Sequence, residues 1–274
     1  MTATAPAVEI HTLLHHDHVS RYLFALRSLT RFWDPPAVVV HDDGTLRADD
    51  TALLTAAQPR LRVIGRDEAD GRVERELKDF PLLRRVRAGN PRLLQLVDYY
   101  LLADAPRVIA MDSDVVFMRR PDAVIDWAGE GGFTVGYSPE YGWEPKGMHW
   151  LPDALPGEPY IADMCCGFVC AEKDAFFAPG ELERIASGID HGILFRPRFV
   201  TQMLYSLLAG RLRSSTVRSF GEPYRSGRLE WLPDEPDRVL CHYFGSHDSD
   251  DALADLVARD PGLTGLAEKW PYAR

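Results

Sequence analysis

Short apolar runs alternate with helical patterns through the first half of the chain, and this order restricts the fold more than any other feature. The run from Val8 predicts a strand, and the range 20–33 predicts a helix because its leucines recur at helical spacing. Strand, helix and strand patterns then follow in the ranges 37–42, 49–57 and 61–66, with Asp49 or Asp50 as the expected helix cap. Such alternation favours a sheet that helices cover on both faces. We expect an α/β fold with a mixed, mainly parallel central sheet, whose ligands bind beyond the carboxyl ends of the strands.

Chain length and charge narrow the class of protein further. The 274 residues are 46% hydrophobic, which is enough for the core of one large domain. The net charge of -10 opposes binding to nucleic acid or to an anionic membrane surface; no nucleic acid partner is expected, and peripheral attachment to a membrane remains an alternative. Because no stretch is long and apolar enough for a membrane span, and the first residues do not have the pattern of a signal peptide, we expect a cytoplasmic protein.

The second half of the chain continues the pattern less regularly. Residues 74–102 are mostly helical and are interrupted at Asn90-Pro91. The range 129–159 is rich in Gly, Pro, Trp and Tyr, and we expect a long irregular segment of the kind that often binds ligands. Strands are predicted at 107–118, 165–171 and 238–246, and helices at 181–189, at 199–210 and near the C-terminus.

Two carboxylates follow the apolar run of the strand predicted at 107–118. On a regular strand Asp112 and Asp114 point to the same face, with Ser113 opposite. Their repulsion is relieved by a cation, and oxygen ligands suit Mg²⁺ or Mn²⁺, which can in turn bind a diphosphate. The alternative is an acidic turn that only ends a strand. His242, at the end of another predicted strand, can complete the metal site, although an isolated histidine is more often a core or surface residue.

The four cysteines allow a second metal hypothesis. Cys165, Cys166 and Cys170 are clustered, but the adjacent pair lacks the spacing of a usual zinc site. Small buried core residues are therefore the favoured interpretation, with zinc as the alternative.

In their order and spacing, several motifs between Val8 and Gly245 resemble those of the family 8 glycosyltransferases and their relatives with the A-type nucleotide-sugar fold. The family has an Arg-Leu pair, a DxD motif, an Asn-Ser-Gly strand, an Asp-Gln pair and a His-x-x-Gly. The corresponding positions here are Arg92-Leu93, Asp112-Ser113-Asp114, Cys165-Cys166-Gly167, Thr201-Gln202 and His242-Tyr243-Phe244-Gly245.

The resemblance implies a metal-dependent transferase that uses a nucleoside-diphosphate sugar, with UDP as the commonest carrier, and a carbohydrate or glycoconjugate acceptor. Asp112, Asp114 and His242 would hold Mn²⁺, with Mg²⁺ as the alternative. Gln202 would stabilise the reacting sugar in a transfer with retention of configuration. The residues implied in donor binding are Asp17, Arg92, Asp112, Ser113, Gly167 and Gly245.

The same resemblance implies one glycosyltransferase domain over residues 1–274. We expect a flexible tail at 1–7, a nucleotide-sugar-binding half at 8–128, an acceptor and catalytic half at 129–245, and a C-terminal helical segment at 246–274.

Departures from the family pattern change the residues expected near the sugar more than those expected to bind the metal. Cys165-Cys166 replaces Asn-Ser, Thr201 replaces the acid before Gln202, and Asp248 stands where the family has a lysine. These changes leave the donor sugar open.

The acceptor side is equally open. The aromatic residues Tyr137, Tyr141, Trp143 and Trp150 can form an acceptor platform or can anchor their segment to the core. Should the transfer invert configuration, the candidate bases are Glu140, Glu144 and Asp163.

Two alternatives compete with the transferase. An apolar strand followed by DxD also describes a haloacid-dehalogenase-type phosphatase, with Asp112 as nucleophile, Asp114 as general acid and Lys173 as the lysine downstream. The chain lacks that family's later acidic pair, and its motif lies far from the N-terminus. The second alternative is a non-catalytic domain that only binds a sugar nucleotide.

Overall fold

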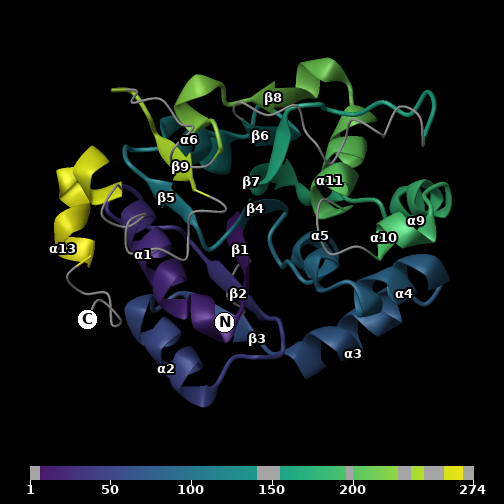
Figure 1. The fold of residues 1–274 in the computed structure, drawn as a ribbon, viewed down its shortest axis with the longest axis horizontal. Coiled ribbons are helices and arrows are strands. Elements are labelled where there is room, and N and C mark those ends of the chain that lie inside the picture. Colours follow the sequence, from purple (N-terminus) through teal and green to yellow (C-terminus); the bar gives the residue numbers. More distant parts are fainter. Residues whose placement is uncertain (1–6, 141–154, 196–199, 228–235, 244–255, 268–274) are drawn as a thin grey trace.

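The central element of the structure is a seven-stranded sheet in the order β3-β2-β1-β4-β7-β6-β8 (Figure 1). The structure is a computed structural model that describes residues 7–140, 155–195, 200–227, 236–243 and 256–267. Strands β3, β2, β1 and β4 are parallel to one another, β7 is antiparallel to both β4 and β6, and β8 is parallel to β6. The mixed, mainly parallel sheet predicted from the sequence is confirmed.

The strands of this sheet are short. They are β1 Val8–Leu14, β2 Val38–Asp42, β3 Leu61–Ile64, β4 Arg107–Met111, β6 Val135–Pro139, β7 Met164–Glu172 and β8 Val217–Ser219. A separate two-stranded sheet pairs β5 Val115–Phe117 with β9 Leu240–His242.

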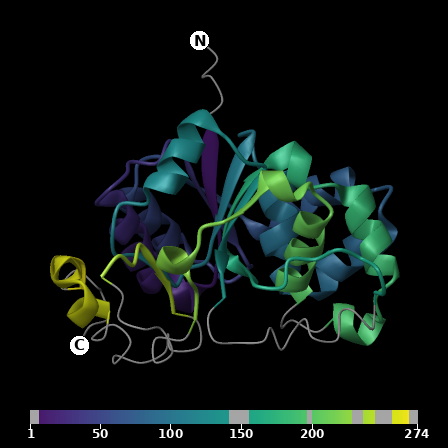
Figure 2. The ribbon, with the colours of Figure 1, turned by 90° about the horizontal axis from the view of Figure 1, so that it is seen from above.

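Helices lie on both faces of the large sheet, as Figure 2 shows from above. One face carries α1 Val19–Thr30, α2 Ala48–Ala57 and α6 Asp122–Glu130. The other carries α3 Arg66–Glu76, α4 Pro81–Gly89, α5 Leu94–Leu101, α8 Lys173–Phe176, α9 Pro179–Ser187, α10 His191–Leu194 and α11 Val200–Gly210. The short α13 Thr264–Ala267 packs beside α1.

A hydrophobic core lies on each face of the sheet. Each strand contributes side chains to both cores because successive side chains point to opposite faces. In β2, Val38 and Val40 pack under α1, while Val39 packs under α3 and α5. In β4, Ile109 faces the α1 side and Val108 the α5 side. Strands that are buried on both faces have continuous apolar runs in the sequence, as β2 and β4 do.

Several sequence predictions need correction. The strand predicted at 107–118 is two strands, β4 and β5, which belong to different sheets. The irregular segment expected at 129–159 contains the strand β6, whose five residues are all buried. Neither Asp49 nor Asp50 is the N-cap of α2: the N-cap is Arg47, and Asp50 accepts a hydrogen bond from its backbone N–H at 2.8 Å.

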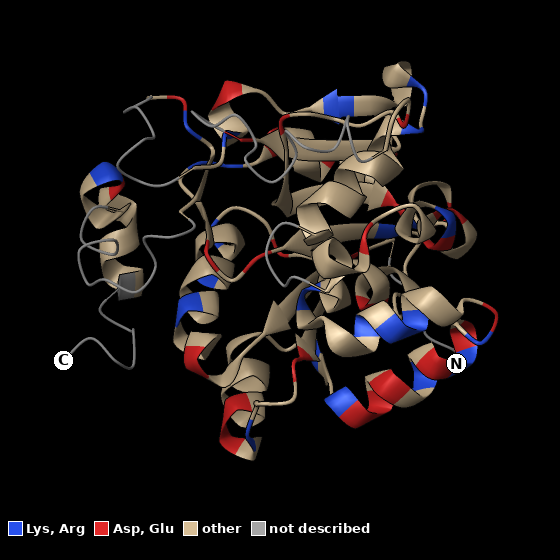
Figure 3. Ribbon diagram, turned by 45° about the vertical axis from the view of Figure 1, so that its right-hand side comes forward, with Lys and Arg blue, Asp and Glu red and all other residues tan. Residues whose placement is uncertain are grey.

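Charged residues of both signs are spread over the helices (Figure 3). On α3, for example, Arg66 and Asp70 form an ion pair one turn apart at 2.8 Å.

Among the described residues, no helix is both long and apolar enough to cross a membrane.

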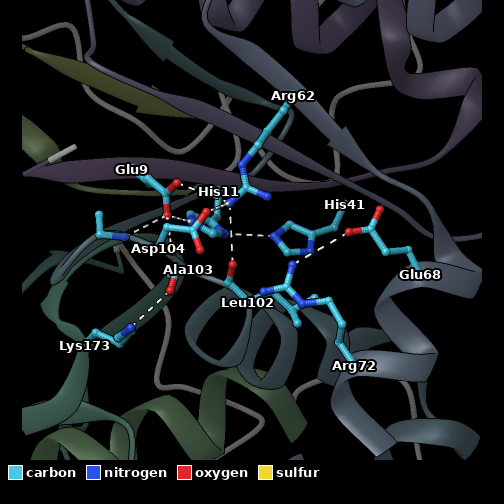
Figure 4. Close-up of polar contacts among 11 residues, drawn as sticks. Glu9, His11, His41, Arg62, Glu68, Arg72, Leu102, Ala103, Asp104 and Lys173 are labelled. Atoms are coloured by element: carbon cyan, nitrogen blue, oxygen red, sulfur yellow. Dashed lines mark hydrogen bonds and ion pairs between the residues drawn. The ribbon is translucent and has the colours of Figure 1, made fainter. Parts of the chain in front are cut away.

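A cluster of buried polar side chains lies between the sheet and α5 (Figure 4). His11 on β1 and His41 on β2 share a hydrogen bond of 2.8 Å between Nδ1 and Nε2, and neither ring is exposed beyond 1%. The other nitrogen of His11 lies 3.2 Å from the carboxylate of Glu9, which Arg62 also contacts at 3.2 Å. The hydroxyl of Tyr99 accepts a hydrogen bond from the backbone of β1.

Burial controls how these histidines titrate. Desolvation lowers the pKa of His11, in opposition to the carboxylate of Glu9, and it lowers the pKa of His41 well below the usual value. At a pH near the usual histidine pKa, both rings therefore bind fewer protons in the folded chain than in the unfolded chain. Since the unfolded state then takes up more protons, acidification below about pH 6.5 destabilises the fold through this pair.

We predict that the substitution His41→Leu makes the protein less sensitive to acid. The variant is expected to be less stable than the parent at about pH 7.5, because His11 loses its partner. Between about pH 7.5 and about pH 5.5, however, its free energy of unfolding should fall by up to about 1.4 kcal/mol less than that of the parent. Urea unfolding at both pH values measures this difference, with His191→Gln on the exposed face of α10 as control. Equal acid losses in parent and His41→Leu would contradict the assignment.

Candidate metal and donor site

The candidate site lies at the carboxyl ends of β1 and β4, which are parallel neighbours. After Met111 the chain leaves the large sheet in a turn over residues 112–114 and enters β5. There β5 pairs antiparallel with β9 so that Val115 is opposite His242. This pairing brings His242 beside Asp114, although the two residues are far apart in the sequence.

Three potential metal ligands converge here. The Nε2 atom of His242 lies 3.2 Å from Oδ1 of Asp114 and 3.7 Å from Oδ2 of Asp112. One ligand atom from each residue lies within 4.8 Å of the other two. Their side chains are 20% exposed for Asp112, 10% for Asp114 and 5% for His242, so the group opens to solvent on the side of Asp112. Two carboxylates and an imidazole are a donor set that suits Mn²⁺ or Mg²⁺.

The charges of the three groups depend on one another. Burial raises the pKa of Asp112. The positive charge of His242 lowers this pKa, and the negative charge of Asp114 raises it further. Burial would lower the pKa of His242, but Cys165 and Asp114 together raise it well above its usual value. A divalent cation would replace the proton of His242 and relieve the repulsion between the carboxylates.

A glycine makes room for the imidazole. The carbonyl of Gly167 on β7 accepts a hydrogen bond of 2.8 Å from the backbone N–H of Asp112. A Cβ atom at this position would overlap the ring of His242. Gly167 is therefore needed at least for the position of His242, a role that the sequence did not predict.

Two side chains that the sequence analysis did not select hold the acidic turn. Gln95 on α5 donates a hydrogen bond of 2.7 Å to Oδ1 of Asp112, and Arg21 on α1 donates one of 3.2 Å to the hydroxyl of Ser113. Both side chains are less than 10% exposed. Their only signal in the sequence is a polar residue on the buried side of an apolar helix, and that pattern has many other causes.

Gln202 on α11 contacts one of the three acids considered as a base. Its Nε2 atom donates a hydrogen bond of 2.5 Å to Oε2 of Glu140, which is 8% exposed at the end of β6. Burial raises the pKa of Glu140, in opposition to Gln202 and His242. Asp163 instead accepts a hydrogen bond from the hydroxyl of Tyr137, and Glu144 lies outside the described residues. Among the described residues, the structure thus distinguishes Glu140, which contacts Gln202, from Asp163, which contacts Tyr137.

The remaining candidates are dispersed around this edge of the sheet. Asp17 is exposed in the 3-10 turn between β1 and α1, where it contacts His15 at 3.4 Å. Arg92 is exposed in the 3-10 turn before α5, its charge acts on Asp112, and its backbone carbonyl accepts a hydrogen bond from Thr201 at 2.8 Å. Gly245 falls outside the described residues.

The aromatic residues do not form a platform within the described part of the chain. Tyr137 is 7% exposed and belongs to the core. Tyr141, Trp143 and Trp150 lie outside the described residues.

The arrangement argues against the phosphatase alternative. Lys173 follows β7, and because β7 is antiparallel to β4, it lies at the opposite end of that strand from Asp112. Its Nζ atom donates to the carbonyl of Ala103 at 3.0 Å (Figure 4). Five residues of strand span roughly 17 Å, which a lysine side chain cannot bridge.

Solved structures provide an independent comparison. No protein-family model matches the chain, and neither does any curated protein. The structure of the galactosyltransferase LgtC in complex with donor and acceptor sugar analogues has a TM-score of 0.55 at 15% identity, with 97% of each chain covered. The chain has the A-type glycosyltransferase fold.

Two further glycosyltransferases share this fold. Mouse xyloside xylosyltransferase 1 has a TM-score of 0.57 at 11% identity, over 90% of this chain and all of the other. Core-mannan synthase A from Aspergillus fumigatus, in its Mn/GDP form, has a TM-score of 0.53 at 12% identity, over 80% and 74% of the two chains. The fold predicted from the motif order is confirmed.

We predict that Gly167→Ala weakens Mn²⁺ binding. The added methyl group must displace the ring of His242, and loss of one ligand position is expected to raise the Kd roughly 10-fold or more. Isothermal titration with Mn²⁺ measures the change. Gly129→Ala on α6 is the control, because a Cβ there meets no atom within 4 Å. Unchanged Mn²⁺ affinity in a folded Gly167→Ala protein would contradict the assignment of His242.

Proposed function

We propose that this chain is a metal-dependent glycosyltransferase that moves a hexose from a nucleoside-diphosphate sugar, with UDP as the expected carrier, to a carbohydrate or glycoconjugate acceptor. The observation that carries the proposal is the convergence of Asp112, Asp114 and His242 at the ligand-binding edge of an A-type sheet. Because the fold alone does not specify a reaction, the proposal rests on the chemistry of this site.

Asp112, Asp114 and His242 would hold the metal, which would be Mn²⁺, with Mg²⁺ as the alternative. When bound, the ion would stabilise the negative charge that develops on the departing diphosphate. The residues around it keep the carboxylates in place: Gln95 fixes Asp112, and Arg21 fixes the turn through Ser113. The mannan synthase structure of the same fold is a Mn/GDP form, which supports a metal and a nucleoside diphosphate as partners here.

The donor would lie along the edge between β1 and β4. Arg92 is an exposed cation near Asp112 and can neutralise part of the diphosphate charge. Asp17, in the 3-10 turn that follows β1, would contact the nucleobase. Ser113, Gly167 and Gly245 complete the donor residues that we propose.

Gln202 would stabilise the positive charge that develops on the donor sugar. An ionised Glu140 can only accept hydrogen bonds, so the amide nitrogen of Gln202 must face it, and the amide oxygen is left for the sugar. An electron-rich oxygen in that place stabilises an oxocarbenium-like centre and fits a transfer with retention of configuration.

We predict that Asp114→Ala abolishes Mn²⁺-dependent turnover of a sugar nucleotide. Slow hydrolysis of a panel of donors, including UDP-glucose, UDP-galactose and GDP-mannose, is followed as release of the nucleoside diphosphate, with and without Mn²⁺. Removal of one of three ligands should lower the rate at least roughly 100-fold. Asp49→Ala, at an exposed acid in the first turn of α2, should behave as the parent.

Other results of the same assay would favour the alternatives. Release of phosphate from simple monoesters, with no turnover of any donor, would favour the phosphatase. Binding of a donor without turnover, even with acceptor sugars present, would favour a non-catalytic domain.

We also predict that Glu140→Gln lowers kcat more than it changes KM. A glutamine at this position can donate as well as accept, so it no longer fixes the amide of Gln202, and the negative charge beside the reacting centre is lost. We expect a fall in kcat of roughly 10- to 100-fold with KM within about 3-fold of the parent. Asp163→Asn, whose carboxylate contacts Tyr137 instead, is the matched control. A change in KM alone would show that Glu140 serves donor binding and not the orientation of Gln202.

A further inference from the structure

The two nitrogen atoms of His242 have different partners. Nε2 faces the carboxylates of Asp112 and Asp114. Nδ1 lies 3.3 Å from the Sγ atom of Cys165, which is 3% exposed. The lone pairs of the two nitrogens point away from each other, so the sulfur is not placed among the ligand atoms that surround a common ion.

This arrangement determines which nitrogen of the imidazole carries the proton. A nitrogen that binds a metal carries no proton, so the proton of a neutral ring that uses Nε2 as ligand is on Nδ1. Nδ1–H then donates its hydrogen bond to Sγ of Cys165. In most metal sites this outer contact is made by a carboxylate, a backbone carbonyl or a water, and it fixes the orientation of the ring.

Cys165 and Gly167 both belong to the part of β7 that contacts the ring of His242. Residues two apart on a strand share a face, and both lie on the face of β7 that meets His242. Gly167 leaves room for the ring, and the sulfur of Cys165 is within hydrogen-bond distance of Nδ1. Cys166, between them, packs against the core cluster that includes side chains of α5 and α11, and its thiol also lies near Asp112.

We propose that Cys165 is a positioning residue for the metal: its sulfur accepts the hydrogen bond from Nδ1 of His242 and so holds Nε2 toward the ion. This rests on the metal site of the proposed function and extends it to a residue outside the ligand shell. It also gives a role to one of the two cysteines at the position where the resemblance leads one to expect Asn-Ser.

The test is Mn²⁺ binding to the metal-free protein, measured by titration calorimetry and by the loss of the free Mn²⁺ signal in electron paramagnetic resonance. Cys165→Ala should raise the Kd roughly 10- to 100-fold, the usual cost of losing such an outer contact. Cys165→Ser keeps an acceptor and should stay within about 3-fold of the parent. Cys166→Ala is the matched control and should bind as the parent does. Circular dichroism and thermal unfolding without metal establish that each variant is folded.

Co²⁺ provides a second readout. The parent loaded with Co²⁺ should lack the strong absorption of a thiolate bound to the metal, because the sulfur contacts the ring and not the ion. Such a band, if lost in Cys165→Ala, would make Cys165 a ligand and overturn the proposal. Equal Mn²⁺ affinity of Cys165→Ala and the parent would also overturn it while leaving the proposed transferase intact. If the parent itself bound no Mn²⁺, the metal-dependent function would fail together with this inference.

Discussion

The site depends on the pairing of two three-residue strands. Because β5 pairs with β9, His242 lies opposite Val115 and beside the acidic turn, although the two segments are more than a hundred residues apart in the chain. Pairing of this kind requires that the chain leave the large sheet directly after Met111, and the turn at residues 112–114 does so. This short ladder is what places the imidazole of His242 beside the carboxylates.

Polar contacts from two helices and from β7 hold the acidic turn at residues 112–114 in place. Gln95 and Arg21 reach it from helices on opposite faces of the sheet, and β7 contacts its backbone through the carbonyl of Gly167. A buried pair of like charges is unfavourable by itself, so these contacts keep in position a group that a cation would then stabilise. A second buried polar group occurs at His11 and His41, where hydrogen bonds link the two rings to each other and His11 to the carboxylate of Glu9.

The fold and the site were predictable to different degrees. The strands β2 and β4 were predictable because each has a continuous apolar run, and β1 because its residues alternate and favour β structure. The strand β6 was missed because its sequence, with Gly136, Ser138 and Pro139, resembles a loop; its burial comes from its neighbours β7 and β8. The order of motifs pointed correctly to the A-type fold, since several motifs in one order are more specific than any single one.

Local patterns in the sequence thus determined the strands, most helices and the two carboxylates that follow β4, because these depend on the residues within a few positions of one another. Only the tertiary structure decided which side chains meet: His242 with Asp114, Cys165 with His242, and Gln202 with Glu140. Such contacts depend on strand register and on how helices pack across the sheet, and neither leaves a periodic signal in the sequence. The physical reason is that a hydrogen bond acts over about 3 Å in space, whatever the separation of its partners along the chain.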